Sequence, residues 1–282
     1  MSKWRPVDNC IYVIPDIHGA VDLLEKCLIR ILPLRNKGGK KDLLIFLGDY
    51  IDRHEDSHAV IDVLIELNKS YPDQVICLKG NHEHMLLMGL EQYPNYLPFE
   101  YKNQWDMWLY NGGKQTISGY IKEAQRKKII NSDIMLSAIN PNLIKKYNLI
   151  PDHHLDFMMN CRDFYEIDDF IFVHGGLNPN FILKNQKPEF LYWDRKLFNY
   201  VKKSISNNIE LPWDRTIICG HSGPEPLFHP RYVMLDGGSP DRLIIFEAHS
   251  REAFASENRK SKLVKLSTAN SVVKRGSFSR NS

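Results

Sequence analysis

Four short polar strings, each directly after an apolar run, carry side chains that could bind metal ions. They are Asp16-Ile17-His18-Gly19, Gly48-Asp49-Tyr50-Ile51-Asp52-Arg53, Gly80-Asn81-His82-Glu83 and Val173-His174-Gly175-Gly176. A Gly220-His221 pair follows a later apolar run. Mixed oxygen and nitrogen ligands favour Mn, Fe or Zn over Ca or Mg. Because the strings occur together and in this order, they predict a site for two divalent metal ions.

The residue types also suggest how the ligands divide between the ions. Two such ions lie about 3.5–4 Å apart and need a bridging carboxylate, for which Asp49 is the best candidate. Asp16 and His18 are two residues apart in an extended turn and can converge on one ion. The second ion would then be bound by Asn81, His174 and His221. Taken singly, each histidine could equally be a hydrogen-bonded turn residue, and His229 is a minor rival of His221.

Phosphate ester hydrolysis is the chemistry that fits this site. Water between two dications loses a proton near neutral pH and becomes a nucleophile. Arg53 follows Asp49 by four residues, and its planar guanidinium matches the geometry of a phosphate group. Arg195, in Tyr192-Trp193-Asp194-Arg195, is a second candidate phosphate clamp, with a surface salt bridge as the alternative.

A leaving alkoxide needs a proton, and His82 is placed to give one. It is adjacent to the predicted ligand Asn81, so it is near the metals but free to act as an acid. Asp52 could orient His82 and stabilise its charged form. The alternative is that Asp52 caps the following helix.

The apolar runs predict the elements that position these residues. Strands are predicted at residues 10–15, 42–47, 75–79, 170–173, 216–219, 231–235 and 243–246. Helical patterns at 20–32 and 57–69 separate the first three strands, which indicates an α/β architecture. In such sheets ligands bind at the carboxyl ends of strands, and each predicted metal-binding string begins there.

The chain as a whole divides into a domain, a cap region within it and a tail. Residues 1–250 are predicted to form the catalytic domain, with an aromatic, helix-rich stretch at 85–168 as a helical cap beside the site. Residues 251–282 contain eight Lys or Arg and two Glu, so this tail carries about +6 and is predicted to be flexible. A strand was conceivable within residues 263–273. Subtracting the tail from the net charge of +3 leaves −3 on residues 1–250, so the body is not a basic nucleic-acid binder.

Composition excludes several other classes of protein. No run of 18 apolar residues exists, so no membrane span is expected. The polar start of the chain does not resemble a signal peptide. Five scattered cysteines with no C-x-x-C motif predict reduced thiols rather than disulfides or a zinc site, and a cytoplasmic protein.

The motifs over roughly residues 10–248 resemble those of the PPP-type serine/threonine protein phosphatases, within the calcineurin-like metallophosphoesterases. The family pattern is GDxHG, GDxVDRG, GNHE, a later HG or HAG, and a late GH, and compact bacterial and phage members are most similar. The resemblance implies an α/β/β/α sandwich of two mixed sheets, and two divalent ions, with Mn²⁺ favoured over an Fe/Zn pair. It also implies metal ligands, phosphate-binding arginines and an acid pair at the positions already named.

This chain departs from the family pattern beside the phosphate site. The usual glycine after Asp-Arg is His54, and a proline that often follows in bacterial members is Glu55. A bulky side chain and an acid here could reshape access to the site or weaken anion binding.

Three functions remain open from the sequence. The first is hydrolysis of phosphoserine or phosphothreonine in proteins or peptides. The second is hydrolysis of diadenosine tetraphosphate, although those enzymes generally lack the aspartate at position 52 and read GNHD where this chain has Glu83. The third is a non-catalytic binding protein, which the complete ligand set disfavours. The basic tail is the only candidate for contact with nucleic acid.

Overall fold

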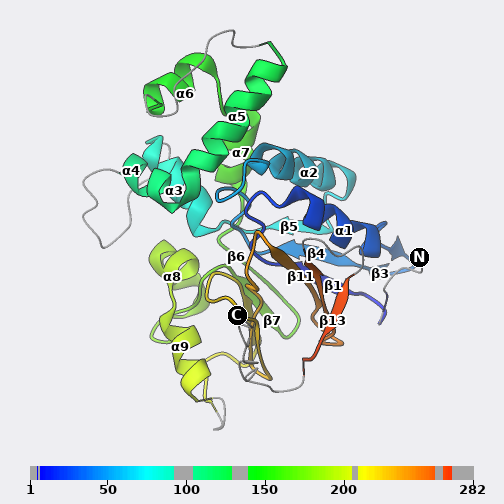
Figure 1. Cartoon of the computed structure of the whole chain (residues 1–282). Helices are drawn as coiled ribbons and strands as arrows, with labels where there is room; N and C mark the ends of the chain where they lie inside the picture. The colour runs from blue at the N-terminus through cyan, green and yellow to red at the C-terminus, as the bar shows by residue number, and fades with distance from the viewer. Residues whose placement is uncertain are drawn as a thin grey trace, which may run out of the picture.

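The computed structural model describes residues 5, 7–91, 104–128, 139–204, 209–257 and 263–268. A six-stranded and a five-stranded sheet form its centre, and a two-stranded hairpin pairs β2 (Asn36–Lys37) with β3 (Lys40–Lys41). Figure 1 shows helices on the outer sides of the two large sheets. No helix within these ranges is long and apolar enough to cross a bilayer.

The first sheet has the order β13-β12-β11-β1-β4-β5. Its parallel half consists of β1 (Ile11–Ile14), β4 (Leu43–Phe46) and β5 (Val75–Cys77). The antiparallel half consists of β11 (Arg242–Glu247), β12 (Ala253–Glu257) and β13 (Val264–Leu266). Helices α1 (Val21–Ile31) and α2 (Ser57–Ser70) follow β1 and β4, as the periodicity predicts.

The second sheet has the order β6-β7-β8-β10-β9. Its strands are β6 (Phe164–Ile167), β7 (Phe170–Val173), β8 (Thr216–Cys219), β9 (Leu227–His229) and β10 (Tyr232–Met234). Strands β7, β8 and β10 are parallel, and the two edge strands are antiparallel to them. A 3₁₀ turn (Leu183–Asn185), α8 (Pro188–Trp193) and α9 (Lys196–Lys203) connect β7 to β8.

Alternating side chains of the central strands place the cores. In β1, Tyr12 and Ile14 pack beneath the helices, while Ile11 and Val13 face Phe170 and Phe172 of the second sheet. The outer face of the second sheet packs against Leu191 of α8 and Leu197 of α9, among others. Both faces of each sheet are therefore covered, which explains the near-continuous apolar runs and confirms the predicted α/β/β/α sandwich.

The predicted cap region is mostly helical where it is described. It contains α3 (Asn81–Gly89), α4 (Gln104–Trp108), a π-helical turn (Leu109–Gly113), α5 (Lys114–Arg126), α6 (Pro141–Tyr147) and α7 (Asp152–Asn160). Residues 92–103 and 129–138 lie outside the described residues. The last part of the region differs from the prediction, because residues 164–167 form the edge strand β6.

The chain beyond residue 250 also differs in part from the prediction of a flexible tail. Residues 253–257 form β12, which pairs with β11, and the segment 263–273 contributes β13 at its start. Ala253, Ala255 and Ser256 of β12 are buried, and this segment belongs to the first sheet. Residues 258–262 and 269–282 lie outside the described residues.

Candidate active site

The predicted metal ligands gather where the carboxyl ends of strands from both sheets meet. Three follow the parallel strands of the first sheet, and two follow neighbouring strands of the second. In chain order they are Asp16 after β1, Asp49 after β4, Asn81 after β5, His174 after β7 and His221 after β8. His18 lies two residues beyond Asp16. All six side chains are buried, with relative exposures of 0–7%.

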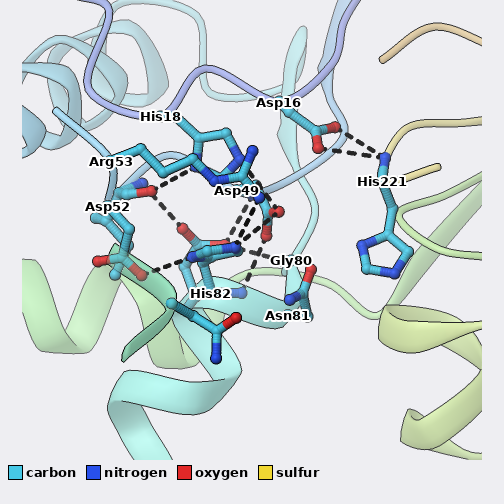
Figure 2. A network of polar contacts seen from close by, with 12 residues as sticks. Asp16, His18, Asp49, Asp52, Arg53, Gly80, Asn81, His82 and His221 are labelled. Atoms are coloured by element: carbon cyan, nitrogen blue, oxygen red, sulfur yellow. Dashed lines mark hydrogen bonds and ion pairs between the residues drawn. The ribbon is translucent and has the colours of Figure 1, made fainter. Parts of the chain in front are cut away.

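Asp49 lies between two groups of potential ligands (Figure 2). Its Oδ2 atom is 3.6 Å from Nε2 of His18, and its Oδ1 atom is 3.3 Å from Nε2 of His174. The ligand atoms of His18, Asp49 and His82 lie within 4.8 Å of one another, as do those of Asp49, His174 and His221. A carboxylate common to two such groups is what a bridging ligand requires.

Two histidines are oriented by backbone carbonyl groups. Nδ1 of His18 donates to the Ile51 carbonyl at 2.8 Å, and Nδ1 of His174 donates to the Leu47 carbonyl at 3.0 Å. Each ring therefore presents Nε2 toward Asp49. In the described part of the chain, Nε2 of His18 is buried without a hydrogen-bond partner. A buried, unpaired nitrogen aimed at a carboxylate fits a metal ligand.

Charge within the site is divided unevenly between neighbouring groups. Burial lowers the pKa of His18 well below its usual range, and the nearby His82 adds to the effect. Burial opposes ionisation of Asp49, but His174 and His82 outweigh it and hold the pKa of Asp49 well below its usual range. Against the effect of burial, Asp49 raises the pKa of His174 to about 9. Metal ions would therefore compete with a proton at His174.

Asp16 and Asn81 contact the histidines of the second group. Both carboxylate oxygens of Asp16 accept from the backbone N–H of His221, at 3.1 and 3.2 Å. Oδ1 of Asn81 lies 3.0 Å from Nε2 of His174. Burial raises the pKa of Asp16, so its carboxylate requires cationic neighbours to stay ionised. The pairing of Asp16 with His18 on one ion remains a prediction.

His82 and Asp52 form a buried pair beside Asp49. Nδ1 of His82 lies 2.7 Å from Oδ2 of Asp52, which leaves Nε2 facing Asp49 at 3.8 Å. Asp52 also accepts from Nε1 of Trp108, at 2.9 and 3.0 Å, and from the hydroxyl of Thr116 at 2.7 Å. Against the effect of burial, Asp49 and Asp52 raise the pKa of His82. The helix-cap alternative for Asp52 is not seen, since its side chain points to His82.

The two arginines approach the site from opposite sides. Nη2 of Arg53 lies 3.3 Å from Nε2 of His82, and Nε of Arg195 donates to Nε2 of His221 at 3.1 Å. Among the described residues, Arg195 forms no ion pair with an acidic side chain, so the salt-bridge alternative finds no support. Asp194 fixes the adjacent backbone, because its Oδ2 atom accepts from the backbone N–H groups of Lys196 and Leu197.

Glu83 joins two loops of the site, a role that the sequence analysis did not assign. Its Oε2 atom accepts from the backbone N–H groups of Asp49 and Gly80, at 2.9 and 3.0 Å. Its Oε1 atom accepts from Tyr50 at 2.7 Å and from Ile51 at 3.3 Å. Glu83 therefore ties the Asp49 loop to the Asn81 loop. Its place in the Gly80-Asn81-His82-Glu83 string was the available signal.

Asp236 is a second residue that the sequence analysis missed. It directly follows the strand-like run 231–235, just as the predicted ligands follow theirs. Burial, together with repulsion from Asp16, raises the pKa of Asp236 to about 8. It is therefore an additional carboxyl group at the rim of the metal-binding region.

The structure accommodates His54 and Glu55, the two departures from the family pattern, without backbone strain. His54 is not among the residues with positive φ, so this position does not require glycine. Glu55 accepts from the hydroxyl of Ser118 at 3.1 Å and pairs with Lys122 on α5. Lys122 and Ser118 lower the pKa of Glu55, and its charge is balanced by the cap rather than left facing an incoming anion.

Comparison with known proteins gives one extended match and several partial ones. Residues 11–250 match the family described as "Calcineurin-like phosphoesterase". The chain is 39% identical over 85 residues to serine/threonine-protein phosphatase PP1-1 of Saccharomyces cerevisiae, covering 29% of this chain and 25% of that protein. It is 33% identical over 113 residues to serine/threonine-protein phosphatase ppe1 of Schizosaccharomyces pombe, covering 39% of this chain and 34% of that protein. The matches thus span about a quarter to a third of these relatives.

A solved structure shares the architecture over nearly its whole length. The crystal structure of a putative diadenosine tetraphosphatase superposes with a TM-score of 0.55 and 16% identity, covering 90% of this chain and 96% of that one. At this identity the similarity concerns the fold alone. The family match over residues 11–250, together with the paired His and Asp groups at the strand ends, shows what the chain is. It belongs to the calcineurin-like phosphoesterase family.

Proposed function

We propose that this protein is a metal-dependent phosphatase that hydrolyses phosphoserine and phosphothreonine in proteins or peptides. The buried His82–Asp52 pair beside Asp49 is the observation that carries the proposal. A serine or threonine alkoxide is a poor leaving group and needs a proton, whereas a nucleotide phosphate leaves with little help. A site that devotes a fully buried carboxylate to a histidine acid therefore favours the alkoxide. The partial similarity to yeast serine/threonine phosphatases adds support.

The metal ligands proposed are Asp16, His18, Asp49, Asn81, His174 and His221. Two divalent ions, with Mn²⁺ favoured and Fe or Zn as alternatives, would supply a hydroxide nucleophile and neutralise phosphate charge when bound. Arg53 and Arg195 bind the remaining phosphate oxygens through their planar donor groups. His82 gives the proton on Nε2 to the leaving oxygen, while Asp52 holds Nδ1 and stabilises the charged ring.

The first prediction concerns substitution of His82 by asparagine. With Mn²⁺ present, His82→Asn should lower kcat on a phosphothreonine peptide by about 10²–10⁴-fold, the usual contribution of a general acid. The loss should be much smaller on p-nitrophenyl phosphate, because p-nitrophenolate leaves without protonation. Steady-state kinetics on both substrates measure the difference, and His249→Asn is the matched control, because this ring contacts Phe170 at the start of β7 rather than the site at its end.

Diadenosine tetraphosphate is the alternative substrate and belongs in the same experiment. If the dinucleotide is cleaved far faster than the phosphopeptide, the protein-phosphatase function is contradicted. The proposed metal ligands would not be affected by that result. Equal losses on both phosphomonoesters in His82→Asn would contradict the acid role instead. Metal-free protein that stays inactive when Mn²⁺ is restored would favour a non-catalytic binding protein.

The setting of the activity is also part of the proposal. All five cysteines are buried and unpaired, which is typical of proteins kept in a reducing compartment and supports the cytoplasmic prediction. The expected partner is a phosphorylated protein or peptide, with no membrane involvement. The predicted role of the basic tail in recruiting nucleic acid concerns residues that lie mostly outside the described ranges.

A further inference from the structure

A second cluster of potential metal ligands lies away from the active site, between the helices α2 and α7. It consists of Asp62 on α2 and of His153 and His154 at the start of α7. One ligand atom from each of the three side chains lies within 4.8 Å of the other two. None of these three residues belongs to the predicted metal-binding strings.

His154 is held like a ligand rather than like a surface histidine. Its side chain is only 3% exposed, and the hydroxyl group of Tyr120 lies 2.8 Å from Nδ1. The opposite nitrogen, Nε2, lies 2.9 Å from Oδ1 of Asp62. Burial lowers the pKa of His154, although Asp62 opposes this, so the ring is neutral near pH 7. A neutral imidazole fixed at one nitrogen and facing a carboxylate is the usual arrangement at a metal site.

His153 and Asp62 make the cluster accessible from solvent. The His153 ring packs edge-on against His154, with the ring centres 4.4 Å apart and an angle of 75° between planes. Asp62 has a side-chain exposure of 57%. Within the described residues, no hydrogen bond is made by the His153 side chain, so its nitrogens are available to an ion. An ion could therefore reach the cluster without opening the fold.

A small cavity adjoins these side chains. Its volume is about 70 Å³, room for an ion and a water molecule, and its lining includes Asp62, His153, His154, His58 and Glu123. Nδ1 of His58 is buried without a hydrogen-bond partner among the described residues. His58 and Asp62 are four residues apart on α2, so they share one face of the helix. The cavity is therefore lined by at least one buried polar atom that has no hydrogen-bond partner among the described residues.

We propose that Asp62, His153 and His154 bind a Zn²⁺ ion that joins α2 to α7, with water completing the coordination. Two imidazoles and one carboxylate with an open fourth position suit this ion. On binding, the His154 proton moves to Nδ1 and is donated to the Tyr120 oxygen, so Nε2 is free for the metal. The site contributes no residue to the phosphate chemistry, so its occupancy should affect stability and leave turnover unchanged. The proposal is independent of the substrate proposed above.

The test is the Zn²⁺ stoichiometry of the full-length protein, measured by equilibrium dialysis against Zn²⁺ alone and elemental analysis. The proposed active site would bind two further Zn²⁺ ions, so we expect three ions per chain in the wild type. His153→Gln should bind only two, because it removes a ligand while leaving the Tyr120–His154–Asp62 contacts in place. Asp62→Asn should likewise lose the third ion, or bind it at least about tenfold more weakly. His249→Gln, which removes an exposed histidine elsewhere, should still bind three.

A second readout does not depend on counting ions. Zn²⁺ should raise the melting temperature of the wild type more than that of His153→Gln, since only the wild type gains the third ion. With saturating Mn²⁺, phosphatase turnover should be the same in both proteins. Two ions in the wild type, or three in His153→Gln, would overturn the proposal. An equal Zn²⁺-induced rise in melting temperature for both proteins would overturn it as well.

Discussion

At the residue scale, the site depends on side chains whose backbone is left-handed. These residues have φ values of 49° to 75° and are His18, Asp49, Asp52, Arg53 and His221. Each such conformation costs about 1–2 kcal/mol relative to ordinary backbone. Hydrogen bonds across the loops offset this, for example from the Ile17 and His18 N–H groups to the Asp49 carbonyl, both at 2.9 Å. The left-handed backbone at these positions directs several side chains toward the candidate site.

Glu83 gives a prediction at this scale. Replacing it by glutamine puts an amide group where two carboxylate oxygens accept four backbone N–H groups. We expect Mn²⁺ affinity to fall by about 10–100-fold, the usual effect of losing a group that orients metal ligands. Activity measured against Mn²⁺ concentration should shift to higher metal and recover at saturation.

Glu66→Gln is the matched control for this substitution. Glu66 is exposed on α2, so the change removes the same charge without touching the metal loops. Unchanged Mn²⁺ dependence in Glu83→Gln would show that the loops hold their geometry without this carboxylate.

At the element scale, the cap contributes hydrogen-bond donors to Asp52 of the proposed acid pair. The end of α4 supplies Trp108 and the first turn of α5 supplies Thr116, and both donate to Asp52. The π-helical turn between them lies close to the loop that carries Arg53, and the Arg53 N–H donates to the Gly112 carbonyl at 3.3 Å. Gly112 has φ of 116°, and a Cβ atom there would lie 2.8 Å from the Arg53 nitrogen. The cap therefore positions both the acid pair and Arg53.

Trp108 tests this role of the cap. Trp108→Phe keeps an aromatic ring but removes the N–H that bonds to Asp52. Hydrogen bonds to charged groups contribute about 1.5–3 kcal/mol, so kcat on a phosphothreonine peptide should fall by about 10–150-fold. Trp105→Phe is the control, because the Trp105 N–H is buried without a partner among the described residues. Equal effects of both substitutions would indicate lost packing rather than a lost bond.

The sequence predicted most of the strands that are buried on both faces, although it missed the three-residue β9, which is buried throughout. All seven predicted strands contain a strand, because buried parallel strands form recognisable apolar runs. Strand β6 was missed since it is a half-exposed edge with Glu166 at its centre. Strand β12 reads Ala-Phe-Ala-Ser-Glu, a composition with weak strand preference, and is stabilised by pairing with β11.

The same reasoning explains which site residues were found. Ligands directly after apolar runs, such as Asp49 and His174, could be placed by position alone. Glu83 could not be assigned, because its four backbone contacts come from loops that meet only in the folded chain. Trp108 lies in the aromatic stretch of the predicted cap, and its bond to Asp52 depends on a turn that sequence periodicity does not describe.

At the scale of the whole molecule, the candidate metal ligands come together only where the two sheets are packed against each other. The first sheet provides the ends of β1, β4 and β5, and the second provides those of β7 and β8. Apolar side chains between the sheets, such as Val13 and Phe172, fix their relative position. Ions bound across this junction would stabilise the packed form by mass action.

Asp42 provides a prediction about stability at this scale. Its buried carboxylate accepts from the Cys10 and Arg35 backbone N–H groups and pairs with the guanidinium groups of Arg35 and Arg5. Burial opposes ionisation, but the Arg35 bonds prevail and lower the pKa of Asp42. Asp42→Asn should therefore reduce the free energy of unfolding by about 2–3 kcal/mol at pH 7, less than for a fully buried pair because both arginines are partly exposed.

The sign of the pH dependence follows from the lowered pKa. The contribution of Asp42 is complete above its unfolded pKa of about 4 and is lost as pH falls through the lower folded value. The stability difference between wild type and Asp42→Asn should therefore shrink below about pH 4. Denaturant unfolding at several pH values measures it, with exposed Asp73→Asn as the control. A difference that grows as the pH falls would contradict the assignment.

The antiparallel pairing of β1 with β11 joins strands from opposite parts of the chain, with Tyr12 opposite Glu247. Glu247 also accepts from the Ile11 N–H at 3.0 Å. During synthesis on the ribosome, β11 emerges more than 200 residues after β1. At about 5–20 residues per second, the edge of β1 waits roughly 10–50 seconds for its partner. During that interval the nascent chain exposes an apolar strand edge that can pair with the wrong strand. A chaperone that covers this edge during translation would prevent such mispairing.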